Sequence, residues 1–129
     1  MRRPTIAWLL VAQATVFAAW WAVLVIAPAS RAYFHCPESR SLGHSHEPTL
    51  LTFWLADAGV IATSLAAAFA VWRGRAWAAP ALWAAAGGTG YAALYCVAHW
   101  IATGASALAV AMMVPSAALA IVLARAGTR

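Results

Sequence analysis

Charged and strongly polar side chains are scarce in this chain of 129 residues. Lysine and asparagine are absent, glutamine occurs once, and the acidic residues are Glu38, Glu47 and Asp57. Only 9% of the residues are charged and 65% are hydrophobic, whereas soluble proteins average about 25% charged and roughly 45–50% apolar residues. This composition effectively excludes a soluble domain and a disordered tail. We therefore expect a single integral membrane domain over residues 1–129, surrounded by a lipid bilayer.

Cysteine and histidine are also too few for several kinds of site. Cys36 and Cys96 are the only cysteines, so the chain lacks the Cys-x-x-Cys pair of thiol–disulfide exchange enzymes and of structural zinc sites. A disulfide between Cys36 and Cys96 stays open, because both are expected on the outer side of the membrane. Only His99 lies inside an apolar run, which disfavours a haem held between helices by two histidines.

Four long apolar runs indicate four transmembrane helices. Their predicted bounds are residues 5–27, 49–72, 76–101 and 105–124. The first run has 23 uncharged residues, which is longer than the roughly 7–15 apolar residues of a signal peptide. Because the two later connections are short, consecutive helices should lie antiparallel to one another. We predict an all-α, up-down-up-down four-helix bundle with one longer outer loop at residues 28–48.

The arginines predict the orientation of this bundle. A cytoplasmic N terminus places six arginines on the cytoplasmic side, namely Arg2, Arg3, Arg73, Arg75, Arg125 and Arg129. The opposite side then has Arg31 and Arg40, so the positive-inside rule places both termini in the cytoplasm of an inner or plasma membrane. The arginines form no continuous basic patch, and we expect no nucleic-acid partner. Five tryptophans near predicted span ends fit an aromatic belt: Trp20, Trp21, Trp72, Trp77 and Trp100.

One acidic side chain, Asp57, falls inside a predicted span. It lies about 12 Å from the outer end of the second span, where an unpaired carboxylate costs at least about 2.5–3.5 kcal/mol. Tyr91, Tyr95 and His99 follow one another at intervals of four residues and share one face of the third span. We expect these four residues to form a catalytic or ligand-polarising cluster. A hydrogen-bonded packing contact between the two spans is the alternative.

The predicted outer loop contains six potential metal ligands within residues 35–47. The candidate ligands of zinc or copper are His35, Cys36, His44 and His46, with Glu38 or Glu47 completing the shell. Their spacing matches no closed structural zinc pattern. Solvated histidines, or histidines against lipid headgroups, are therefore the alternative.

Further residues in the spans predict packing. Four uncharged polar side chains are expected to hydrogen-bond to the backbone or across helices: Gln13, Thr15, Thr63 and Ser64. The small residues Gly88, Ala92 and Cys96 share a helix face and indicate close approach of a neighbouring helix. Three tryptophans farther from the span ends are expected to line a hydrophobic pocket or contact neighbouring helices: Trp8, Trp54 and Trp83.

Several functions fit these features. The first is a small helical subunit that packs with other membrane subunits, or with itself, and whose polar cluster binds a hydrophobic ligand. The second is an enzyme or binding protein for a quinone, prenyl or sterol-like lipid, with Asp57 or His99 as acid or base. Metal binding by the outer loop is the third. Proton-coupled transport by a dimer built on Asp57 is a further alternative.

Overall fold

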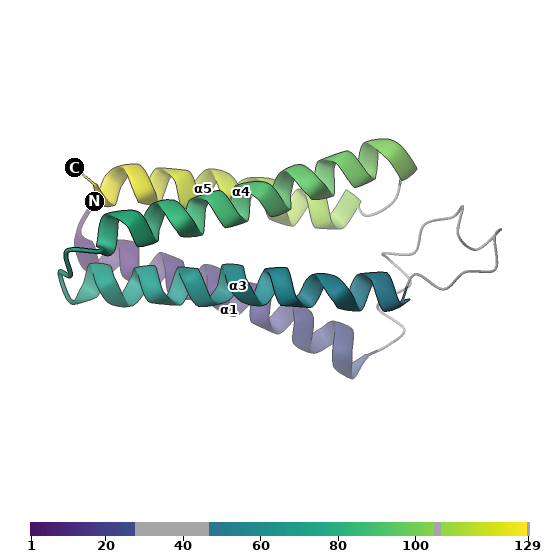
Figure 1. Ribbon diagram of the computed structural model, residues 1–129, viewed down its shortest axis with the longest axis horizontal. Coiled ribbons are helices and arrows are strands. Elements are labelled where there is room, and N and C mark those ends of the chain that lie inside the picture. Colours follow the sequence, from purple (N-terminus) through teal and green to yellow (C-terminus); the bar gives the residue numbers. More distant parts are fainter. Residues whose placement is uncertain (28–46, 105–106, 129) are drawn as a thin grey trace.

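The computed structural model describes residues 1–27, 47–104 and 107–128, and within them it contains four helices and no strands. The helices are α1 (Arg3–Ile26), α3 (Glu47–Trp72), α4 (Ala78–Thr103) and α5 (Ala107–Gly127) (Figure 1). The prediction of an all-α chain with four helices is confirmed, and each helix begins and ends within three residues of its predicted bounds. Residues 28–46, most of the predicted outer loop, lie outside the described part of the chain.

Proline and glycine account for the helix ends. Pro4 lies in the first turn of α1, where a missing amide proton leaves no intrahelical hydrogen bond unmade. Gly104 ends α4 with a φ of 68°, a left-handed conformation that favours glycine. The connection between α3 and α4 turns at Gly74, where φ is 61°. Pro115 lies inside α5, and the helix continues past it to Gly127.

The helices pack as two close pairs. α1 packs against α3, α4 packs against α5, and the pairs meet mainly through α3 and α4. Figure 1 shows both chain ends and the α3–α4 turn at one end of the bundle. In agreement, a Cβ atom on Gly74 would lie 3.1 Å from Nη1 of Arg3. We call this end, which carries the termini, the arginine end, because Arg2, Arg3, Arg73, Arg75 and Arg125 are exposed near it.

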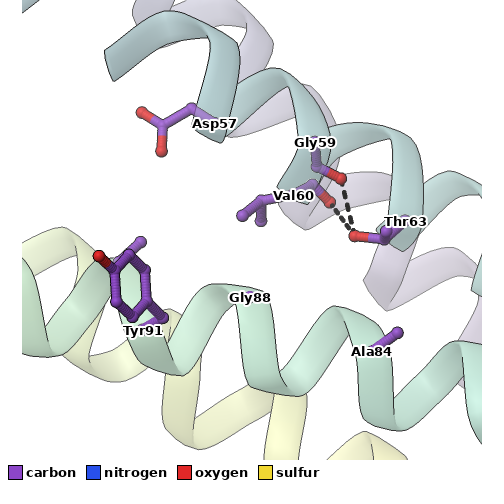
Figure 2. Close-up of a pocket in the computed structure, with 8 residues that line it drawn as sticks. Asp57, Gly59, Val60, Thr63, Ala84, Gly88 and Tyr91 are labelled. Carbon is purple, nitrogen blue, oxygen red and sulfur yellow. Dashed lines mark hydrogen bonds between the residues drawn. The ribbon is translucent and has the colours of Figure 1, made fainter.

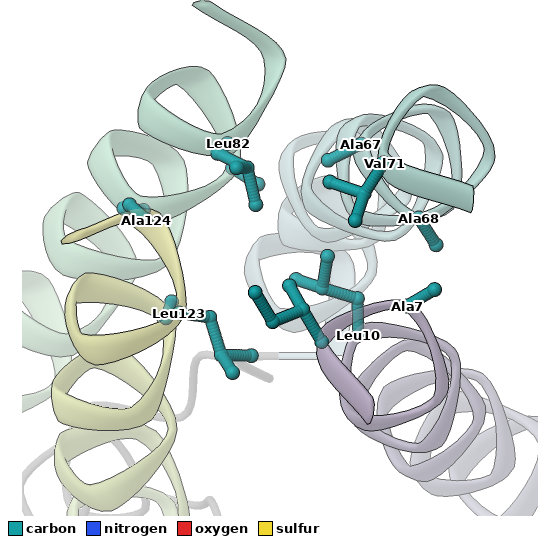
Figure 3. Packing of buried hydrophobic residues seen from close by; sticks show 12 residues of the cluster. Ala7, Leu10, Ala67, Ala68, Val71, Leu82, Leu123 and Ala124 are labelled. Atoms are coloured by element: carbon teal, nitrogen blue, oxygen red, sulfur yellow. The ribbon is translucent and has the colours of Figure 1, made fainter. Parts of the chain in front are cut away.

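Two apolar clusters fill the interior. The cluster nearer the arginine end consists of Ile6, Ala7, Leu10, Ala67, Ala68, Val71, Leu82, Ala85, Ala86, Ala120, Leu123 and Ala124 (Figure 3). The second cluster consists of Phe17, Val60, Ala93, Met113 and Ala117. Alanine makes up much of both clusters, so small side chains let the helices approach closely.

Three buried polar residues lie between the two clusters, Gln13 on α1, Ser64 on α3 and Thr89 on α4, and they form the buried polar layer. The partly buried Ser116 of α5 lies beside it. Nε2 of Gln13 donates a hydrogen bond to the carbonyl oxygen of Ser116 at 3.4 Å, which links α1 to α5. Thr89 donates to the carbonyl of Ala85 at 2.7 Å. Oε1 of Gln13 and Oγ of Ser64 are buried without a hydrogen-bond partner among the described residues. Of the four polar side chains expected to hydrogen-bond to the backbone or across helices, Gln13, Thr15 and Thr63 do so, and Ser64 has no such bond among the described residues.

Apolar side chains also cover much of the exterior. Within the described residues, α1 and α5 are the two helices long and apolar enough to cross a membrane, and residues 57–72 of α3 form a shorter apolar segment. Only 28% of the apolar window in each of these two helices is buried. A core helix of a soluble protein would be covered on most sides, so this exposure favours an apolar environment around the bundle.

Candidate functional site

A largely apolar groove of about 220 Å³ lies between α3 and α4. Its lining residues are Asp57, Gly59, Val60 and Thr63 from α3, and Ala84, Gly88, Tyr91 and Ala92 from α4 (Figure 2). Two glycines provide part of the space. A Cβ atom on Gly59 would meet nothing within 4 Å, whereas one on Gly88 would lie 3.4 Å from Cγ2 of Val60. The distance at Gly88 is an ordinary van der Waals contact, and the neighbour that Gly88 faces is α3.

The polar groups of the groove gather at one end. Figure 2 shows the carboxylate of Asp57 and the ring of Tyr91 at the same end, with Ala84 and Thr63 toward the other. The hydroxyl of Thr63 donates to the carbonyls of Gly59 at 2.8 Å and of Val60 at 3.0 Å. Because this hydroxyl already bonds within its own helix, Asp57 and Tyr91 provide the polar chemistry of the groove.

Asp57 accepts a hydrogen bond from α1. Nε1 of Trp21 donates a hydrogen bond to Oδ2 of Asp57 at 2.7 Å, and both side chains are partly buried. An indole N–H can only donate and a carboxylate accepts several hydrogen bonds, so this contact occupies part of the carboxylate and leaves further acceptor positions. The contact also joins α1 to the helix that lines the groove.

The sequence places Trp21 in an expected aromatic belt and does not predict its contact with Asp57. The helix lengths could have indicated that Trp21 and Asp57 lie at similar heights in the bundle. Trp21 lies about 27 Å from the start of α1, and Asp57 lies about 22 Å from the end of α3. Both of these helix ends are at the arginine end of the bundle, so the two residues have similar heights. A buried carboxylate needs a donor, and Trp21 is a donor at the required height.

Tyr95 and His99 form a second, separate pair on α4. Their rings stack with centroids 6.3 Å apart and an angle of 12° between planes. Neither residue lines the groove that contains Asp57 and Tyr91. The structure therefore brings two of the four expected cluster residues together in the groove and places the other two beyond it along α4.

The candidate metal site falls outside the described residues, since His35, Cys36, His44 and His46 all belong to residues 28–46. Within the described part of the chain, no three or more histidine, cysteine or acidic side chains form a group that could hold a metal ion. Cys96 is a half-buried free thiol there.

The three tryptophans farther from the span ends do not line the groove. Trp8, Trp54 and Trp83 are exposed on the outer surface of the bundle. Trp8 packs against Trp72 with ring centroids 5.9 Å apart. Of the two roles expected for these three tryptophans, contact with a neighbouring helix is the one found for Trp8, which meets α3.

Comparison with known proteins gives no matching family model, no matching curated protein and no matching solved structure. The function is therefore inferred from the groove, the exposed apolar surface and the distribution of charge.

Proposed function

We propose that this chain is an integral membrane protein with four antiparallel membrane-spanning helices that packs as a subunit of a larger membrane assembly. The exposed apolar surface supports the membrane location. The arginines at one end support cytoplasmic termini, because positive residues near span ends are retained on the cytoplasmic side. Because almost all described residues belong to the four helices, we favour a role that depends on helix packing.

The observation that carries the subunit role is the exposed face of α4 at mid-height. Tyr91 is 71% exposed and Leu94 is 72% exposed, and Tyr91 lies at the middle of α4. No described residue hydrogen-bonds to the hydroxyl of Tyr91. A polar hydroxyl that faces hydrocarbon without a partner costs free energy, so this face is better covered by a neighbouring helix than by lipid tails. The neighbour is another subunit or a second copy of this chain.

Site-specific photocrosslinking in native membranes tests this role. A photoreactive phenylalanine analogue at Leu94 should give a discrete protein adduct, because the proposed neighbour packs against this face. Val16 is the matched control, since it is also exposed and lies near mid-height, on α1. Native mass spectrometry should then show the intact chain in a complex. A monomeric mass, together with lipid adducts alone at both positions, would refute the subunit role.

A second candidate function is the binding of a small hydrophobic ligand in the groove. The specific observation is that Asp57 and Tyr91, expected from the sequence to act together, line one apolar groove. Tyr95 and His99 do not line it, so we propose binding rather than acid–base catalysis. Mass spectrometry of small molecules that copurify with the protein tests this function. Gly59→Leu fills the groove and should remove the ligand, whereas Gly87→Leu, at a glycine outside the groove, should retain it.

A further inference from the structure

We propose that the groove between α3 and α4 binds a small lipophilic cation, namely an amine or quaternary ammonium group on an apolar body, with its positive charge beside Asp57. This inference rests on the second candidate function and adds the chemical class of the ligand. The charge, the remaining hydrogen-bonding capacity of Asp57 and the size of the groove each support it.

Charge complementarity is the main argument. Among the described residues, Asp57 is the only charged side chain that lines the groove, and its recorded side-chain partner is the neutral indole of Trp21. Arg73, on the connection that follows α3, lies about 24 Å away along the helix axis. A carboxylate in apolar surroundings is strongly favoured by an adjacent positive charge. Because none of the described residues that line the groove is basic, we assign the source of that charge to the ligand.

The hydrogen bond from Trp21 further restricts the chemical class of the ligand head group. Because the indole N–H donates to Oδ2, Asp57 acts as an acceptor in this contact. When Asp57 is ionised, a ligand head that offers only acceptors, such as a quinone carbonyl, would place its oxygen against carboxylate lone pairs. An ammonium group avoids this repulsion. The ring of Tyr91 lies at the same end of the groove, and an aromatic face attracts a cation further.

The remaining lining fits the apolar body of such a ligand. Val60, Ala84 and Ala92 supply apolar contacts, and Gly59 and Gly88 leave room for it. The volume of about 220 Å³ is below the roughly 300–1,000 Å³ of pockets for drug-sized ligands. The groove therefore suits a body about the size of one aromatic ring, or one end of a longer amphiphile.

Two probes of nearly equal shape isolate the effect of charge. Benzyltrimethylammonium is a cation, and neopentylbenzene is its neutral counterpart, with carbon in place of nitrogen. Binding of each probe to the full chain in lipid nanodiscs is measured by ligand-observed nuclear magnetic resonance. We expect the cation to bind at least tenfold more tightly than the neutral probe. Asp57→Asn should remove this preference and leave binding of the neutral probe unchanged.

Groove variants show where the probes bind. Gly59→Leu should abolish binding of both probes, and Gly87→Leu should leave both unchanged. Tyr91→Leu should weaken binding of the cation more than binding of the neutral probe. This variant keeps the test decisive if Asp57→Asn does not fold.

Equal affinity of the wild-type protein for both probes would overturn the cation proposal and leave ligand binding in the groove intact. If neither probe binds, or if Gly59→Leu binds both normally, the cation proposal and the second candidate function both fail.

Discussion

The hydrogen bond between Trp21 and Asp57 gives the most direct test of the described geometry. The two residues lie on α1 and α3, and the donor–acceptor distance is 2.7 Å. Trp21→Phe removes the donor and keeps an aromatic ring, and Asp57→Ala removes the acceptor. A double-mutant cycle with both substitutions isolates the energy of the contact from the other effects of each change.

The expected coupling energy is about 0.6–1.7 kcal/mol, which runs from the average to the largest value obtained for hydrogen bonds between membrane helices. The upper part of this range is expected, because hydrogen bonds to a charged acceptor are stronger than neutral ones. Partial exposure of both side chains limits the value. The free energy of unfolding is measured for all four proteins by titration with sodium dodecyl sulfate in mixed micelles, with circular dichroism as the readout.

The control cycle pairs Trp21→Phe with Thr63→Val. Among the described residues, the hydroxyl of Thr63 bonds to carbonyls of its own helix, about 9 Å along α3 from Asp57. Independent sites are additive to within about 0.3–0.5 kcal/mol, so this cycle should give no coupling beyond that. If the Trp21–Asp57 cycle also gives a coupling energy below about 0.3 kcal/mol, the hydrogen bond does not stabilise the fold, and the role of α1 in holding Asp57 is refuted.

Further predictions concern packing and orientation. Leu123→Ala should lower the free energy of unfolding by about 2 kcal/mol in the same detergent titration, because a cavity of roughly 80 Å³ costs ~24 cal/mol per Å³. The control Val122→Ala, on the exposed face, should lower it by less than about 0.5 kcal/mol. Gly127→Ala should lower stability because its Cβ would lie 2.5 Å from Cδ1 of the buried Leu82, whereas Gly87→Ala meets nothing and should be neutral or stabilising. A fluorescent protein at the C terminus should fluoresce, and alkaline phosphatase there should be inactive in a bacterial host; the reverse pattern would contradict cytoplasmic termini.

The helices could be predicted because their signals are local. Long apolar runs, Pro4 near the start of α1 and Gly104 after α4 each act within one or two turns of the chain. The remaining differences in the bounds have local causes too. The predicted fourth span ended before Arg125, whereas α5 includes this residue, because an arginine in the last turn is compatible with a helix and favourable near its C-terminal dipole.

The site was harder to predict because it depends on the rotation of each helix about its axis. The spacing of Tyr91, Tyr95 and His99 shows that they share a helix face, and it does not show which part of that face meets α3. Each residue advances 100° around an ideal helix, so positions four residues apart still differ by about 40°. Over eight residues this displacement reaches about 80°, which is enough to carry His99 out of a groove lined by Tyr91.

The groove and the buried polar layer lie on different faces of the same two helices, about 100° apart around each helix axis. Thr63 and Gly88 line the groove, while the next residues in the chain, Ser64 and Thr89, are buried between the apolar clusters. Beside the groove, Gly88 of α4 faces Val60 of α3, where an added Cβ atom would lie 3.4 Å from Cγ2 of Val60. The polar layer sits at the junction of both clusters, where a shift of either helix would displace apolar side chains. Because the groove walls are set by this packing, a ligand would enter a largely preformed site, and little of its binding energy would be spent on ordering the protein.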